Sequence, residues 1–183
     1  MEHETTHTET LRDKLIAAGI AELAAHGLSN FSLRRVANAC GASCAAPYRH
    51  FKNREALLAA MVDYINGQWG LFAENIIRAF VDDKRTCLIE VCVAFIRFLF
   101  ANDNYRSVLS ASGEHLLSGE DKLPSLLKEY AATVGMDDTS ATRVLYTMRA
   151  LVYGTVAMLA NGELTNTADT FEMVRQALAK ELC

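Results

Sequence analysis

The side chains best suited to bind a charged partner lie between residues 28 and 54. This window has no aspartate or glutamate but five basic side chains, at Arg34, Arg35, Arg49, Lys52 and Arg54. Residues 57–183, by contrast, hold 11 basic and 16 acidic side chains, and the whole chain has a formal net charge of −4. Because a local cationic surface attracts a phosphate backbone whatever the overall charge, this pattern predicts a small nucleic-acid-binding module joined to a larger acidic one.

The same window predicts two short helices separated by a tight turn. Ser32 is a suitable N-cap for the first helix, which we expect to end at Gly41. Ser43 can cap a second helix that runs to Phe51 and has Pro47 near its first turn. Two short helices joined by a turn of about three to four residues make a helix-turn-helix, whose second helix enters the major groove of DNA. A solvated surface turn is the alternative interpretation.

Residues 31–58 resemble the DNA-binding domain of the tetracycline-repressor (TetR) family. The shared features are the Ser-opened helix, the Gly-containing turn, the run Tyr-Arg-His-Phe at 48–51 and the run Lys-Asn-Arg-Glu-Ala-Leu at 52–57, with Ala42 replacing the usual Val. The resemblance covers residues 10–60 and continues as helix layout to the end of the chain. It implies a homodimer that represses transcription from a palindromic operator and leaves the DNA when a small-molecule effector binds.

By position, the resemblance also implies which residues bind DNA. In this view Ser32 caps its helix and contacts phosphate, and Tyr48 and His50 hold phosphates, although the Tyr48 ring could instead pack in the core. The full set is Ser32, Arg34, Arg35, Ser43, Cys44, Ala45, Ala46, Tyr48, Arg49, His50, Lys52 and Arg54. Since the side chains at 44–46 offer little hydrogen bonding, base readout would depend on Arg34, Arg49 and DNA shape.

Elsewhere the apolar residues recur with helical spacing. Thr10 and Asp13 resemble a capping box for a helix that stops at Gly27, and Asn53 can cap a long helix. Further helices are expected over 85–102, 105–110, 123–134, 138–160 and 167–182, which predicts an all-α fold of about nine helices. We expect a helix-turn-helix domain over residues 1–55, with the motif at about 31–50, and a helical effector-binding and dimerisation domain over residues 56–183.

In the resembled family, the last two helices of each subunit form a four-helix bundle across the two-fold axis. Here these helices have the apolar residues that such a bundle needs. They are Val144, Leu145, Met148, Val152, Val156, Phe171, Val174 and Leu178. The alternative is that these side chains only close the core of one chain.

An effector pocket would be enclosed by the fourth to eighth helices. Its candidate residues are Trp69, Phe72, Phe95, Leu99, Tyr105, Leu109, Leu116, Arg149 and Tyr153. Aromatic side chains with one or two polar groups suit an apolar or amphipathic small molecule, and ordinary core packing is the alternative. Residues 149–159 are similar to the penultimate helix of a subgroup with the signature Trp-x-x-x-His-Gly, although Arg149 and Tyr153 replace the Trp and the His and only Gly154 is kept.

Other classes of function find less support in the sequence. No segment reaches the ~18 consecutive apolar residues of a membrane span, and the polar N-terminus lacks the features of a secretory signal, so we expect a cytoplasmic protein. There is no Gly-rich phosphate loop and no catalytic triad spacing. We therefore expect no enzyme activity, no metal and no cofactor. An all-α ligand-binding or interaction dimer without specific operator binding is the alternative function.

The five cysteines leave one further alternative open. They form no Cys-x-x-Cys pair, so neither a disulfide scaffold nor a zinc site is expected. Cys44 nevertheless lies where oxidation would disturb DNA contact, and Cys40 is four residues away. A cysteine-based, redox-responsive regulator is therefore a second alternative, although ordinary buried thiols are the simpler interpretation.

Overall fold

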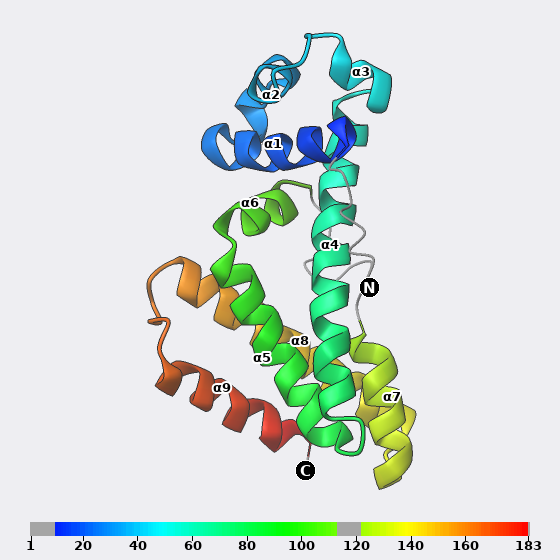
Figure 1. Ribbon diagram of the computed structural model, residues 1–183. Helices are drawn as coiled ribbons and strands as arrows, with labels where there is room; N and C mark the ends of the chain where they lie inside the picture. Colours follow the sequence, from blue (N-terminus) through cyan, green and yellow to red (C-terminus); the bar gives the residue numbers. More distant parts are fainter. Residues whose placement is uncertain (1–9, 113–121, 183) are drawn as a thin grey trace, which may run out of the picture. The chain divides into compact units, whose positions relative to one another are not determined.

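The computed structural model describes residues 10–112 and 122–182. Within these ranges it contains nine α-helices, one short 3-10 helix and no strand, which confirms the predicted all-α fold. The helices are α1 (Leu11–His26), η1 (Leu28–Asn30), α2 (Leu33–Ala39), α3 (Ala46–His50), α4 (Arg54–Ala79), α5 (Lys84–Ala101), α6 (Asp103–Ser112), α7 (Leu123–Val134), α8 (Asp138–Ala160) and α9 (Ala168–Glu181) (Figure 1).

Contacts between residues divide the chain into two compact units. Among the described residues, the first unit comprises 10–65 and 103–112, and the second comprises 66–102 and 122–182. The first unit therefore holds α1 to α3, the beginning of α4 and α6. The second holds the remainder of α4 together with α5 and α7 to α9. Helix α4 is continuous through Ile65, the last residue that it contributes to the first unit.

The first unit is built around α1. The predicted capping box is present, because the Thr10 hydroxyl accepts from the Asp13 N–H at 3.2 Å while the Asp13 carboxylate accepts from the Thr10 N–H at 3.1 Å. Helix α1 packs against α2, α3 and α6. Its approach to α4 is close at Gly19, where an added Cβ would lie 2.9 Å from the Met61 sulfur. A glycine at this crossing lets the two helix backbones approach each other.

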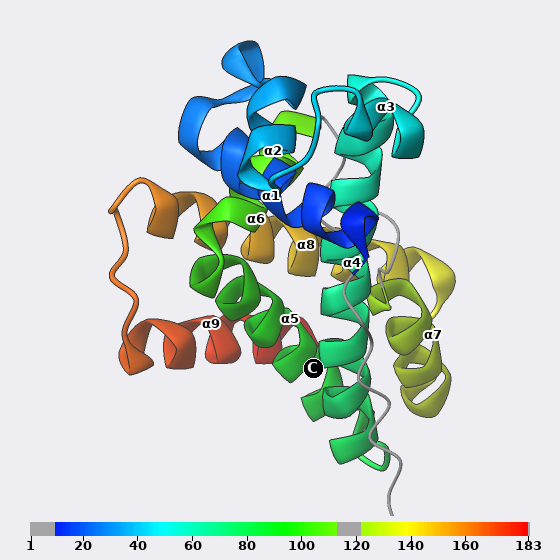
Figure 2. The ribbon, with the colours of Figure 1, turned by 45° about the horizontal axis from the view of Figure 1, so that its top comes forward.

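Helix α5 is the centre of the second unit. It is buried along most of its length and packs against α7, α8 and α9, in keeping with its all-round apolar sequence. Figure 2 shows α9 beside it. The C-terminal end of α9 is anchored by polar contacts, since the Tyr130 hydroxyl donates to the Leu182 carbonyl at 2.6 Å and Arg85 donates to the Ala179 carbonyl at 2.7 Å. Among the described residues, no helix has the length and apolar content needed to cross a membrane.

Candidate nucleic-acid interface

The turn between α2 and α3 is fixed by its own backbone. Helix α2 opens as predicted, with the Ser32 hydroxyl accepting from the Arg35 N–H at 3.4 Å. It closes with the two hydrogen bonds of a Schellman motif, from the Gly41 N–H to the Asn38 carbonyl at 3.0 Å and from the Ala42 N–H to the Ala37 carbonyl at 2.9 Å. Gly41 has a φ of 63°, a conformation that L-residues with a Cβ rarely adopt.

Helix α3 is shorter than the sequence predicted. It begins at Ala46 rather than Cys44, and the Ser43 carbonyl rather than its hydroxyl receives the Ala46 N–H, at 2.8 Å. Ala46 and Pro47 are buried. The side chain of Ala46 offers little surface to DNA, and its predicted contact stays a prediction. Cys44 and Ala45 precede the helix and are exposed, as a groove-facing segment requires.

Arg35 is held by α1. Its Nε and Nη2 atoms donate to the Glu22 carboxylate at 2.8 and 2.5 Å, and Nη2 also donates to the Asn30 carbonyl. Glu22 is buried and accepts a further bond from the Ser32 N–H at 3.1 Å. These hydrogen bonds, that of Arg35 above all, hold the pKa of Glu22 below its ordinary value. The structure thus places Arg35, a predicted DNA contact, in the link between α1 and α2.

Arg54 also has contacts within the domain. Its guanidinium donates to the Leu28 carbonyl and lies over the Phe31 ring, 5.5 Å from the ring centroid. In the same way Arg12 of α1 lies 5.4 Å from the centroid of the Phe51 ring. Phe31 and Phe51 are buried, so the two arginines cover the edges of the small core.

The remaining predicted polar residues are exposed around the turn and α3. Tyr48 is 60% exposed, so its ring does not take the alternative core position. Arg34, Ser43, Arg49, His50 and Lys52 are exposed as well. No carboxylate in the described part of the chain forms an ion pair with Arg34, Arg49 or Lys52, whereas Arg35 is paired. Three basic side chains of the helix-turn-helix therefore remain available to a polyanion.

A comparison with protein-family models agrees with this geometry. Residues 15–61 match the family described as bacterial regulatory proteins of the tetR family. The helix-turn-helix described above lies inside this matched segment. The matched segment runs from the buried part of α1 to the first turns of α4, and so it includes both Glu22 and Arg35. A search of the curated proteins gave no significant match.

Solved structures extend the likeness to the whole chain. A protein of unknown function from Rhodococcus sp. RHA1 has a TM-score of 0.76 at 22% identity, over 98% of this chain and 97% of that one. A TetR family transcription regulator from Marinobacter aquaeolei VT8 has a TM-score of 0.68 at 18% identity, over 93% and 94% of the two chains. A single-residue variant of TetR from Acinetobacter baumannii AYE, in complex with minocycline, has a TM-score of 0.61 at 20% identity, over 92% of each. At these identities the likeness shows a shared two-domain, all-helical fold.

The predicted pocket residues do not form one cavity. Trp69, Phe95 and Leu99 are buried in the second unit, and the hollow beside Trp69 and Phe95 has a volume of only about 10 Å³. Ordinary core packing, the alternative, fits these three side chains, and their role in binding an effector stays a prediction. Tyr105 and Leu109 belong to α6 and therefore to the first unit.

The other predicted pocket residues have different surroundings. Arg149 and Tyr153 are half-buried on α8, and Leu116 lies outside the described residues. Phe72 is the one described member of the set with a largely exposed side chain, at 49%. It lines a separate hollow on the outside of the second unit.

The predicted dimer residues face inward. Seven of the eight are at most 4% exposed within a single chain: Val144, Met148, Val152, Val156, Phe171, Val174 and Leu178. These seven side chains help to close the core of the single chain, as the alternative interpretation expects, and their role in a dimer stays a prediction. Only Leu145 is half-buried. The outward faces of α8 and α9 carry different residues, among them Tyr146, Met158 and Met173.

The described thiols differ in accessibility. Cys44 is exposed and Cys40 is half-buried, whereas Cys87 and Cys92 are buried in α5. Burial raises the pKa of Cys87, which disfavours the reactive thiolate there. In the part of the chain that the structure describes, no cluster of histidine, cysteine, aspartate or glutamate could hold a metal ion.

Proposed function

We propose that this protein is a DNA-binding transcriptional regulator, a repressor that binds a palindromic operator as a homodimer and leaves it when a small molecule binds. The observation that carries the proposal is the exposed set Arg34, Tyr48, Arg49 and Lys52 around a rigid turn, in a domain that matches the tetR family. Phosphate oxygens are the natural partners of such cations, because charge-assisted bonds to them replace condensed counterions on the DNA.

In this proposal, the start of α3 enters the major groove. Cys44 and Ala45 are small and exposed, so they let the backbone approach the base edges. Lys52 and Tyr48 bind phosphates and set the register of the domain on the duplex. Sequence readout depends on Arg34, Arg49 and the deformability of the operator, since the small residues supply few hydrogen bonds. Arg35 and Arg54 contribute indirectly, by holding the helices that carry these residues.

The outward face of α8 supports a homodimer. Tyr146, Ala150, Gly154 and Ala157 recur at helical spacing on this face, and Tyr146 is 75% exposed. Gly154 is notable because an added Cβ would meet nothing within 4 Å in its own chain. A glycine within a helix costs about 0.5–1 kcal/mol relative to alanine, and a close helix–helix contact is one role that offsets this cost. Close approach of the equivalent helix of a second subunit supplies such a contact, and two-fold symmetry matches a palindromic operator.

An effector is the third part of the proposal. The Acinetobacter TetR, solved in complex with minocycline, is a protein of this fold that binds a small molecule. Here α4 runs from the helix-turn-helix unit into the second unit without a break, so it connects the two. The protein can then exist in two conformations that differ in the placement of α4. An apolar or amphipathic effector that binds the conformation with low DNA affinity more tightly shifts the population away from the DNA-binding state. Each 1.4 kcal/mol or so of this preference changes the balance tenfold.

DNA binding is the direct test of the proposal. The purified protein is titrated with DNA from immediately upstream of its own gene, over a series of salt concentrations and against scrambled competitor. We expect tight, competitor-resistant binding that weakens steeply with salt. The double variant Tyr48→Ala/Arg49→Ala should lose this binding and stay dimeric, while Arg78→Ala, at an exposed arginine near the end of α4, serves as the control. Equal binding to scrambled DNA would instead favour the alternative of a ligand-binding dimer without an operator.

A further inference from the structure

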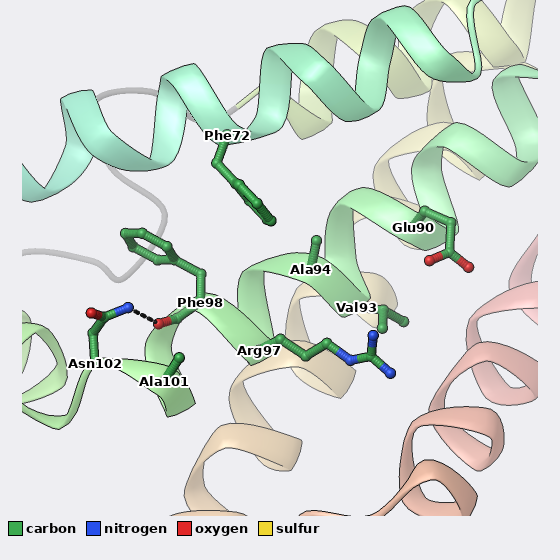
Figure 3. Close-up of a pocket in the computed structure, with 8 residues that line it drawn as sticks. All are labelled: Phe72, Glu90, Val93, Ala94, Arg97, Phe98, Ala101 and Asn102. Carbon is green, nitrogen blue, oxygen red and sulfur yellow. Dashed lines mark hydrogen bonds between the residues drawn. The ribbon is translucent and has the colours of Figure 1, made fainter.

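A groove runs along the outside of α5 in the second unit. It has a volume of about 340 Å³ and is lined by residues from α4, α5 and the turn after α5. Figure 3 shows the rings of Phe72 and Phe98 at one end, where they project into the groove from α4 and α5. Arg97 extends from α5 toward Val93 and the other end, where Glu90 is also found.

The ring end of the groove is backed by a cluster of aromatic side chains. The ring of the buried Trp69 lies 6.1 Å from that of Phe72, 5.6 Å from that of Phe98 and 4.9 Å from that of Phe95. Asn102 fixes the end of α5 beside these rings, since its amide donates to the Phe98 carbonyl at 2.8 Å. An aromatic surface of this kind, held from behind, suits a flat or ring-shaped apolar group.

The charges at the other end leave one cation unbalanced. The Glu90 carboxylate accepts from Arg175 of α9 at 2.6 and 3.1 Å, so its charge is already compensated. The Arg97 guanidinium instead lies over the Phe171 ring, 4.4 Å from the centroid, and no carboxylate of the described residues pairs with it. A cation–π contact leaves the N–H donors of a guanidinium unused, and such a group can bind a carboxylate with two parallel bonds.

We infer that this groove is a binding site for a small amphipathic organic carboxylate. Its apolar ring packs between Phe72 and Phe98, and its carboxylate binds the N–H groups of Arg97. The volume is large enough for a molecule of this class, because a cavity of roughly 150 Å³ accommodates benzene. That such a carboxylate is the effector rests on the function proposed above. The binding site itself stands on the groove and can be tested without DNA.

The test uses Trp69, the single tryptophan of the chain, as the reporter. Its fluorescence is followed while the full-length protein is titrated with three probes of one carbon skeleton: 3-phenylpropanoate, 3-phenylpropanol and 3-phenylpropylamine. We expect saturable binding of the carboxylate, with an affinity for the alcohol about tenfold or more lower and the weakest affinity for the amine. Equal affinity for the acid and the alcohol, tightest binding of the amine, or no saturable signal with the acid would each overturn the inference.

Two variants test the charged end and the aromatic end of the groove one at a time. Arg97→Met should weaken the carboxylate about tenfold and leave the alcohol within about twofold, whereas Phe72→Ala should weaken both probes. Arg78→Met, a matched loss of an exposed arginine on α4, should change neither affinity. Retained carboxylate affinity in Arg97→Met or in Phe72→Ala would place the probe elsewhere and overturn the inference. Thermal melts of each variant confirm that the fold is intact.

The outcome for the groove is separable from that for the proposed function. Loss of carboxylate binding with operator binding intact rejects the groove alone, and carboxylate binding without operator binding rejects the proposed regulator alone. With both present, adding 3-phenylpropanoate to the protein–operator complex should lower the DNA affinity of the wild-type protein and leave that of Arg97→Met unchanged. Unchanged DNA affinity of the wild-type protein at saturating probe would show that the groove is not the effector site.

Discussion

Glu22 of α1 accepts two hydrogen bonds from the guanidinium of Arg35 in α2, at 2.5 and 2.8 Å, and it is buried while Arg35 is half exposed. The same carboxylate receives the Ser32 N–H, which precedes the first turn of α2. One acidic side chain thus fixes both the start of α2 and the position of Arg35 against α1. This contact links the first helix of the helix-turn-helix to its supporting helix.

Replacing Glu22 by glutamine should destabilise the protein in a pH-dependent way. The amide keeps the shape but loses the charge, so we expect the free energy of unfolding near pH 7 to fall by about 1–3 kcal/mol. Because the pKa of Glu22 is lower in the folded state, its contribution is complete above the unfolded-state pKa, about 4.5, and is lost as the pH falls through the lower folded-state value. Urea melts of wild type and Glu22→Gln across this range should therefore converge at low pH.

The exposed Asp63 of α4 provides the matched control. Asp63→Asn removes the same charge from the same unit and should change the unfolding free energy by less than about 0.5 kcal/mol at every pH. If Glu22→Gln were as stable as wild type near pH 7, or if its deficit persisted in acid, the contact would not stabilise the fold through its charge.

The sequence alone predicted the basic window. It could not show which basic side chains are available to DNA and which are bound by groups within the domain. The partners of Arg35 and Arg54 lie 13 and 26 residues away, at Glu22 and at the Leu28 carbonyl, and no local pattern reveals such pairs. One signal was present. Glu22 follows Gly19 by three residues and Leu15 by seven, so it falls on the apolar face of α1, where a buried carboxylate requires a cationic partner.

Helix boundaries were predicted well where a local hydrogen bond sets them. The Asn53 side chain accepts from the Ala56 N–H at 2.9 Å at the start of α4, as its sequence context indicates. The apolar residues of α8 were harder to interpret, because spacing shows that Met148 and Val152 share a face but not what covers that face. Here the chain itself covers it, and a partner's surface must be sought among residues that the apolar pattern did not select.

Gly41 should resist substitution for reasons of backbone conformation alone. Its φ is 63°, and an added Cβ would meet nothing within 4 Å, so Gly41→Ala carries no steric clash. We expect this variant to lose about 1 kcal/mol of unfolding free energy, because alanine disfavours the left-handed region. Gly41→Asn should lose less, since asparagine tolerates this region. Urea denaturation measures both.

Gly67 gives the opposite expectation and serves as the control for Gly41. It lies inside α4, is exposed and has equally open space around a Cβ, so Gly67→Ala should stabilise the protein by up to about 1 kcal/mol. If alanine at both positions changed stability in the same direction, backbone conformation would not explain the role of Gly41.

The arginines and lysine of the helix-turn-helix should fall into two groups when each is replaced by alanine. Lys52→Ala and Arg49→Ala should leave the unfolding free energy within about 0.5 kcal/mol and lower the slope of log affinity against log salt by about 1 each. Arg35→Ala should instead lower the unfolding free energy by about 1–3 kcal/mol, because it leaves the Glu22 carboxylate buried without its main partner. Fluorescence-anisotropy titrations at several salt concentrations, paired with urea melts, measure both quantities.

These roles are wrong if Lys52 or Arg49 affects stability and Arg35 affects only DNA binding. A Lys52→Ala protein with wild-type salt dependence would show that Lys52 does not contact phosphate. An Arg35→Ala protein that has wild-type stability but binds DNA weakly would show that Arg35 contacts DNA, as the sequence predicted.

Gly154 should control the association of two chains. An added Cβ at this position meets nothing within 4 Å in its own chain, whereas a leucine would separate two α8 helices that approach each other at Gly154. We therefore expect Gly154→Leu to weaken the dimer at least about tenfold in sedimentation velocity, with the helical content of the monomer retained. Gly67→Leu is the matched control, since Gly67 is also an exposed helical glycine with no neighbour within 4 Å of a Cβ, and it should stay dimeric. If both variants dimerise like wild type, the subunits meet on a different face, because a leucine cannot be accommodated between helix backbones in close contact.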